Sequence, residues 1–244
     1  MYQNYIFDLY GTLIDINTDE WNVQLWKKMQ ILYGYRGAIY TYRELQKEYG
    51  KLIDKEKKAV HSRHPEYRVI DIKLDKVFRS LYTQKGVKPI KADVLYTAEA
   101  FRCFSTKYIK LYDGVTDLLD TLKDKGKKIY LLSNAQRSFT ENELNMLNLT
   151  PYFDGICISS DEECSKPDKC YFDILFKRYG LKKKESIMIG NDYLSDIGGA
   201  ADYGIDSLYI HQSISPVIEG KLRSDYTIMD GDVFKIKKLI VKGS

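Results

Sequence analysis

The chain has 244 residues, 44% of them hydrophobic and 30% charged, which is the composition of an ordinary globular protein. That composition excludes a disordered chain, a collagen-like chain and a small disulfide scaffold, and no apolar run approaches the roughly 18 residues that span a bilayer. Because no basic region precedes an apolar stretch at the N-terminus, we expect a cytoplasmic protein with no membrane partner. In that compartment the four cysteines are expected to be reduced thiols. They are Cys103, Cys157, Cys164 and Cys170.

The net charge of +4 is too small to indicate a nucleic-acid partner, and none is expected. The charge is unevenly distributed, however. Residues 15–110 hold 20 basic and 12 acidic side chains, a net of +8, so the rest of the chain has a net of −4. This distribution suits a small anionic ligand held between the two parts, and it equally suits a solvated helical surface rich in lysine.

The first predicted element is a buried strand, because residues 4–10 are short, apolar and rich in β-forming side chains. A tight turn at Gly11 and Thr12 ends it. Residues 15–110 then form a predicted all-helical insert, with Trp21 and Trp26 in its core. Apolar residues recur there at helical spacing in four stretches, 20–33, 41–60, 70–85 and 91–109.

From residue 111 onward, short apolar strands alternate with helices, which is typical of a parallel sheet covered on both faces. Strands are predicted at residues 128–132, 155–159, 186–190, 206–210 and 226–229, and helices near 117, 140, 168, 195 and 232. Thr140 and Glu143 fit a capping box, which predicts that one helix begins there. The predicted fold is α/β: a Rossmann-like core of residues 1–14 and 111–244, with the helical cap of residues 15–110 inserted after the first strand.

Ligands of parallel sheets bind beyond the carboxyl ends of the strands, so the residues at those ends are candidates for chemistry. One carboxylate there can attack a phosphoryl group, two acidic groups and a carbonyl can hold Mg²⁺, and a lysine can neutralise charge. Each residue alone is an ordinary turn or cap residue, but their conjunction at four successive strand ends is specific. In chain order the candidates are Asp8, Tyr10, Thr12, Ser133, Asn134, Lys166, Asn191, Asp192 and Asp196.

The segments that carry these candidates resemble the four motifs of the haloacid dehalogenase superfamily. They are residues 7–13, 131–134, 166–168 and 189–197. The helical insert lies where the C1-type caps of that superfamily lie, between the first and second motifs. The resemblance covers the core and implies a hydrolase with a Rossmann-like fold and a cap domain.

The resemblance also implies a role for each candidate. Asp8 would be the nucleophile that forms a covalent aspartyl intermediate, and Lys166 would orient it and offset its charge. The phosphate would be bound or positioned by Thr12, Ser133, Asn134 and Lys166. The cofactor Mg²⁺ would lie between Asp8, the backbone carbonyl of Tyr10, Asp192 and Asp196.

Two positions depart from the pattern that the resemblance leads us to expect. Asn191 stands where the first acid of the fourth motif usually stands. Asp192, one residue later, would either replace that acid as a metal ligand or lie next to the ligands without binding the metal. Tyr10 stands two residues after the nucleophile, where phosphatases of the superfamily have an aspartate that protonates the leaving oxygen. A phenol with a pKa near 10 is a poor replacement at neutral pH, and its use costs about 10²–10⁴-fold in rate.

These observations predict a hydrolase, namely a Mg²⁺-dependent phosphatase that acts on a small phosphate monoester through an aspartyl phosphate at Asp8. Two alternatives stay open. Tyrosine in the sequence Asp-x-Tyr-Gly-Thr is a feature of the 2-haloacid dehalogenases, which use no metal because halide leaves without a proton. A catalytically weak member that binds a phosphorylated ligand would also tolerate Tyr10. Cap residues that could contact an anionic substrate are, by charge alone, Lys27, Arg36, Arg43 and Arg102.

Overall fold

The computed structural model describes residues 2–242, and for residues 239–242 it describes the backbone only. A six-stranded parallel sheet forms the core, with the strand order β5-β4-β1-β6-β7-β8. The strands are β1 (Asn4–Phe7), β4 (Lys128–Ser133), β5 (Gly155–Ile158), β6 (Ser186–Gly190), β7 (Asp206–Ile210) and β8 (Tyr226–Ile228). This sheet confirms the predicted α/β fold, and it places the first strand of the chain between β4 and β6.

Helices cover both faces of the sheet because successive strand residues point to opposite sides. On one face, Phe7 and its neighbours pack against α5 (Val115–Asp124) and α10 (Val233–Lys242). On the other face, Ile6 packs against α8 (Lys169–Tyr179) and α9 (Gly199–Tyr203). The strands are therefore buried on both sides, which explains their nearly continuous apolar sequences.

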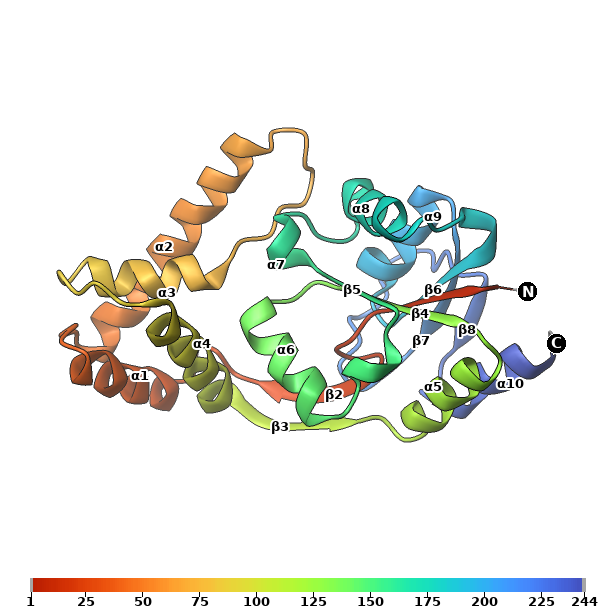
Figure 1. The fold of residues 1–244 in the computed structure, drawn as a ribbon, viewed down its shortest axis with the longest axis horizontal. Coiled ribbons are helices and arrows are strands. Elements are labelled where there is room, and N and C mark those ends of the chain that lie inside the picture. The colour runs from red at the N-terminus through yellow and green to blue at the C-terminus, as the bar shows by residue number, and fades with distance from the viewer. Residues whose placement is uncertain (1, 243–244) are drawn as a thin grey trace.

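The cap is a separate group of four helices at the far end of the molecule from the sheet (Figure 1). These helices are α1 (Val23–Tyr35), α2 (Tyr42–Arg63), α3 (Leu74–Thr83) and α4 (Lys91–Ser105). Each lies within or close to one of the four predicted stretches. The cap has its own core, in which the ring of Trp26 lies 5.0 Å from that of Tyr49 and 5.7 Å from that of Phe101, centroid to centroid.

The sequence analysis missed one element of the insert. Strands β2 (Ile14–Thr18) and β3 (Thr106–Leu111) pair as an antiparallel ribbon that connects the cap helices to the core. The insert is therefore not helical throughout, and the predicted domain boundaries at residues 14/15 and 110/111 cut through this ribbon. The prediction failed because residues 91–109 continue the apolar periodicity of α4, whereas the backbone becomes extended at Thr106.

Two local predictions were wrong. The helix α6 (Arg137–Met146) begins three residues before Thr140, so Thr140 and Glu143 lie inside the helix and form no capping box. The cysteines are not all reduced thiols, because Cys164 and Cys170 form a disulfide on either side of the Lys166 loop. Cys103 and Cys157 are free thiols, as predicted.

The search for membrane-crossing segments was negative. None of the helices within residues 2–242 combines the length and the apolar character that crossing a bilayer requires.

The cap core provides a stability test with a matched control, a second tryptophan in the turn before α1. Trp26 is 1% exposed, whereas Trp21, which was also predicted in the core, is 58% exposed. We expect Trp26→Ala to lower the free energy of unfolding by about 3–5 kcal/mol, because it removes a large buried ring. Trp21→Ala should cost less than about 1 kcal/mol. Denaturant unfolding of both variants tests this, and equal losses would contradict the packing described here.

Candidate active site

Seven of the nine predicted candidates line one small cavity at the carboxyl edge of the sheet, which has a volume of about 210 Å³. The arrangement follows from topology, because β1, β4 and β6 are neighbours and all end at this edge. The seven are Asp8, Tyr10, Asn134, Lys166, Asn191, Asp192 and Asp196. Thr12 and Ser133 are close in sequence to these lining residues but do not line the cavity themselves.

Lys166 is the centre of the site. Its ammonium group donates hydrogen bonds to Oδ1 of Asp8 at 2.6 Å and to Oδ1 of Asp196 at 2.7 Å. All three side chains are buried, and Lys166 and Asp196 almost completely so. Charge-assisted bonds of this length hold both carboxylates in fixed positions. The second oxygen of Asp8, Oδ2, accepts no hydrogen bond from residues 2–242, so it is available to a ligand in the cavity.

Burial and the neighbouring charges shift the pKa values of Lys166 and Asp196. Burial alone would lower the pKa of Lys166, but the charges of Asp196 and Asp8 outweigh it and raise that pKa above its ordinary value. Burial and the charge of Asp8 raise the pKa of Asp196 to about 7, although Lys166 acts in the opposite direction. One ammonium therefore neutralises two buried carboxylates incompletely.

The loop after β6 positions the remaining acid. Oδ1 of Asp192 accepts hydrogen bonds from the backbone N–H groups of Leu194 and Ser195, and so caps the short helical turn Tyr193–Gly198. The backbone N–H of Asp192 in turn donates to Oδ2 of Asp196 at 2.9 Å. Asp192 thus reaches the cavity although it stands one residue after the expected position.

Asn191 stands at the position where the first acid of the fourth motif was expected, and its side chain is hydrogen-bonded within the protein. Its Oδ1 accepts a hydrogen bond from the hydroxyl of Thr12 at 3.3 Å, and its amide group donates to the hydroxyl of Ser215. Gly11 makes this possible, because its φ is +82° and a Cβ there would lie 2.3 Å from Nδ2 of Asn191. The hydroxyl of Thr12 therefore contacts Asn191 and connects the loop after β1 to the loop after β6.

Ser133 and Asn134 end β4 in different environments. The amide side chain of Asn134 bonds the Lys166 loop in both directions, donating to the carbonyl of Lys166 and accepting from its backbone N–H. The hydroxyl of Ser133 is completely buried and has no hydrogen-bond partner within residues 2–242. An unpaired buried hydroxyl is rare in proteins, and it is a feature that a bound oxygen ligand would satisfy.

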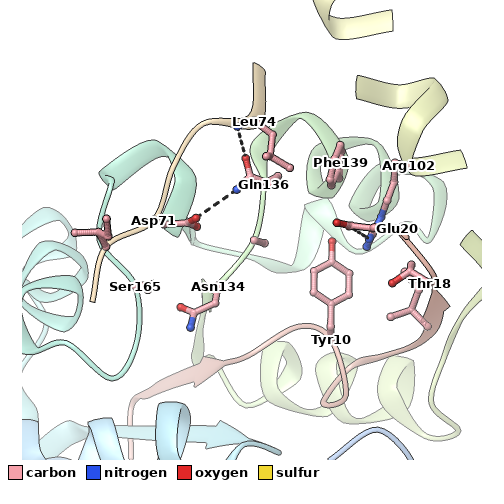
Figure 2. Close-up of a pocket in the computed structure, with 13 residues that line it drawn as sticks. Tyr10, Thr18, Glu20, Asp71, Leu74, Arg102, Asn134, Gln136, Phe139 and Ser165 are labelled. Atoms are coloured by element: carbon pink, nitrogen blue, oxygen red, sulfur yellow. Dashed lines mark hydrogen bonds and ion pairs between the residues drawn. The ribbon is translucent and has the colours of Figure 1, made fainter. Parts of the chain in front are cut away.

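The hydroxyl end of the Tyr10 side chain points toward Glu20 and Arg102 (Figure 2). Its hydroxyl donates to Oε2 of Glu143 and is 3.0 Å from the hydroxyl of Thr140. Burial, followed by the charge of Glu143, raises the pKa of Tyr10 well above its ordinary value of 10. The phenol is therefore fixed as a structural hydrogen-bond donor and is unsuited to donate its proton in a reaction at neutral pH.

Among the four basic cap residues that were candidates, Arg102 approaches the site. Nε of Arg102 donates to Oε1 of Glu143 at 2.6 Å, and its guanidinium lies 5.3 Å from the ring centre of Tyr10. Arg36 instead pairs with Asp93, while Lys27 and Arg43 lie over the ring of Tyr42. Sequence analysis missed Glu143 as a site residue because it fitted the pattern of a capping box.

The cavity has the donor chemistry that a Mg²⁺ ion requires. Its lining carries three carboxylates and one ammonium group, a formal excess of two negative charges, and Mg²⁺ binds oxygen ligands that include one or two carboxylates. Oδ2 of Asp192, like Oδ2 of Asp8, accepts no hydrogen bond from residues 2–242. Asp8 and Asp192, each with an open carboxylate oxygen, could therefore contribute to such a site, whereas both oxygens of Asp196 are bonded within the protein and a ligand role for Asp196 and for the carbonyl of Tyr10 stays a prediction.

A family model described as "Hydrolase: haloacid dehalogenase-like hydrolase" matches residues 2–204. The chain belongs to the haloacid dehalogenase-like hydrolase family. A curated relative in Streptococcus pneumoniae, pyrimidine 5'-nucleotidase PynA, is 24% identical over 213 residues, which cover 85% of this chain and 83% of the relative. Further curated relatives, most of them named phosphatases or pyrophosphatases, are matched over only 50 to 61% of their own length.

Solved structures of haloacid dehalogenase-like proteins share the fold. The HAD-hydrolase YfnB of Bacillus subtilis, whose structure is bound to magnesium, has 20% identity and a TM-score of 0.57, with 98% of this chain and 99% of that chain covered. A 2-haloacid dehalogenase of Pseudomonas syringae pv. Tomato has 15% identity and a TM-score of 0.69, with both chains covered completely. At these identities the likeness establishes the fold, and it confirms the predicted architecture of a haloacid dehalogenase-like hydrolase.

The central position of Lys166 predicts a large effect on stability. Lys166→Met should lower the free energy of unfolding at neutral pH by about 3–5 kcal/mol, because it leaves two buried carboxylates without their cation. Lys169→Met, which replaces an exposed lysine three residues away, should change it by less than about 0.5 kcal/mol. Urea unfolding of the two variants measures the difference. Similar stability of both variants would mean that the carboxylates do not depend on Lys166.

Proposed function

We propose that this hydrolase is a Mg²⁺-dependent phosphatase that hydrolyses a small phosphate monoester through a phosphorylated Asp8. The observation that carries the proposal is the buried contact of Lys166 with both Asp8 and Asp196, in a cavity that has an excess of negative charge. That arrangement suits a transferred phosphoryl group and a divalent cation together. The phosphatase names of several curated relatives support it.

In the first step, Oδ2 of Asp8 attacks the phosphorus atom, and the bond from phosphorus to the leaving oxygen breaks. Lys166 holds Oδ1 of Asp8, so the other oxygen faces the cavity. The hydroxyl of Ser133 and the backbone N–H of Asn134 would bind phosphoryl oxygens, and Thr12 would keep the loop beside Asp8 in place. Bound Mg²⁺ would supply positive charge that offsets the repulsion between the carboxylate and the phosphate.

In the second step, a water molecule attacks the phosphorus atom of the aspartyl phosphate, which releases inorganic phosphate and restores the carboxylate of Asp8. Tyr10 supplies no acid or base in either step, because its hydroxyl is bonded to Glu143 and Thr140. Loss of general acid–base assistance lowers rates by about 10²–10⁴-fold. The enzyme should therefore turn over esters of acidic alcohols much faster than those of alkyl alcohols.

A second candidate function is hydrolytic dehalogenation of a 2-haloacid at Asp8. The orientation of Tyr10 favours it, since halide leaves without a proton and no acid is needed at that position. The three carboxylates that line the cavity count against it, because this chemistry uses no metal ion to neutralise them.

Turnover of 4-nitrophenyl phosphate, whose leaving group is acidic, separates these functions. We expect hydrolysis that requires Mg²⁺ and that falls by about a thousandfold or more in Asp8→Asn, because the nucleophile is lost. Asp113→Asn, a change at an exposed aspartate outside the site, is the matched control and should retain full activity. Equal rates for Asp8→Asn and the wild type would refute the proposal. Chloride release from 2-chloropropionate without metal would favour the dehalogenase.

A further inference from the structure

A second and larger cavity, of about 490 Å³, adjoins the catalytic cavity. The two cavities share Tyr10 and Asn134, which lie at the boundary between them. The larger cavity lies between the cap and the core, because its lining comes from β2, α4, the α2–α3 connection and the start of α6 (Figure 2). A volume of this size accommodates a small metabolite. If phosphate is bound at Asp8, the larger cavity is the space for the rest of the ester.

The charge of the larger cavity is the opposite of what the basic cap sequence indicated. Two carboxylates line it, Glu20 and Asp71, and Arg102 is the one basic side chain that does so among residues 2–242. Arg102 is already committed to the core, because Nε and Nη2 both donate to the carboxylate of Glu143. The one cation of the described lining is therefore shared between the carboxylates of Glu143 and Glu20, which disfavours binding of a second anionic group of a substrate.

The two carboxylates differ in how fully they are bonded. Asp71 accepts hydrogen bonds from the backbone N–H of Ile72, from the hydroxyl of Ser159 and from the amide of Gln136, so its oxygens are occupied by the protein. The carboxylate of Glu20 accepts no hydrogen bond from residues 2–242.

The nearest cation to Glu20 is Nη1 of Arg102, at 3.9 Å, and the side chain is 36% exposed to the cavity and solvent. Burial raises the pKa of Glu20 above its ordinary value, while Arg102 acts in the opposite direction. Figure 2 shows the carboxylate and the guanidinium converging over the ring of Tyr10. Glu20 is thus held at the wall of the cavity by one long ion pair with Arg102, and its carboxylate has room to accept a hydrogen bond from a ligand.

The remaining lining suits a hydroxylated or ring-shaped group. Tyr10 and Phe139 supply aromatic surface, and the guanidinium of Arg102 lies 5.3 Å from the centre of each ring. Thr18, Gln136 and Ser165 supply neutral polar groups. Such a wall contacts the apolar faces of a sugar or polyol and bonds its hydroxyl groups.

We propose that Glu20 is a specificity-determining residue, which selects phosphate monoesters whose leaving alcohol carries an amino group or other hydrogen-bond donors and rejects those with a second acidic group. This inference rests on the proposed function, because it takes the larger cavity as the site of the leaving group. The physical basis is that an amine or hydroxyl satisfies Glu20, whereas a carboxylate or second phosphate would face two fixed negative charges.

Binding to the Asp8→Asn protein in the presence of Mg²⁺ tests the inference without turnover. The probes are glucosamine 6-phosphate, glucose 6-phosphate and 6-phosphogluconate, which carry an amine, a hydroxyl and a carboxylate. In calorimetric titration, we expect the dissociation constant of glucosamine 6-phosphate to be about tenfold or more below that of 6-phosphogluconate. Adding Glu20→Gln should reduce this ratio to about threefold or less, because one of the two negative charges is removed.

The control is Glu141→Gln in the same background, because Glu141 is an exposed glutamate of α6 that does not line the cavity. It should leave the ratio unchanged. Equal affinities for the amine and the carboxylate, an equal fall of the ratio in both glutamine variants, or no binding of any probe would each overturn the inference. If the wild type shows no turnover that depends on Asp8, the proposed phosphatase function is refuted, but a measured preference for the amine over the carboxylate would remain valid. The failure of the proposed function and the failure of this inference are therefore distinguishable.

Discussion

The ammonium group of Lys166 lies between two buried carboxylates, and the rest of the site is arranged around that contact. Asp8 ends β1 and Asp196 follows β6, so the parallel sheet brings both acids to one edge, and the loop that carries Lys166 closes over them. One positive charge compensates two negative ones only in part. The remaining negative charge, together with Asp192, makes the cavity suitable for a divalent cation and a phosphoryl group.

The cap adds the second constraint, which is the chemistry of the space next to Asp8. The larger cavity meets the catalytic one at Tyr10, and Tyr10 is fixed by Glu143 of α6, which also binds Arg102 of α4. In phosphatases of the superfamily, the position of Tyr10 is expected to hold an aspartate that transfers protons. In this chain Tyr10 instead forms part of a contact between the core and the cap. Under the proposed function, the leaving oxygen has no acid at Tyr10, and the larger cavity, lined by Glu20, Asp71 and Arg102, is the space for the leaving group.

The sequence predicts the sheet, the four cap helices and the strand-end residues because each depends on local periodicity or on a rule of parallel sheets. It does not predict contacts between distant elements. Thr140 and Glu143 match a capping box locally, yet their side chains bind Tyr10, more than a hundred residues earlier. Glu20 belongs to no motif, and the role proposed for it depends on its position beside Arg102 in the folded chain.

The central claim is that Asp8 accepts a phosphoryl group with the help of Mg²⁺, and it can be tested without knowing the substrate. Beryllofluoride mimics a phosphoryl group on a carboxylate, and a ligand that binds only the folded state raises the melting temperature. The measurement is the melting temperature with Mg²⁺ and beryllofluoride, alone and together, for the wild type and Asp8→Asn. The account predicts a rise that requires both additives and Asp8. No rise in the wild type, or an equal rise in Asp8→Asn, would contradict it.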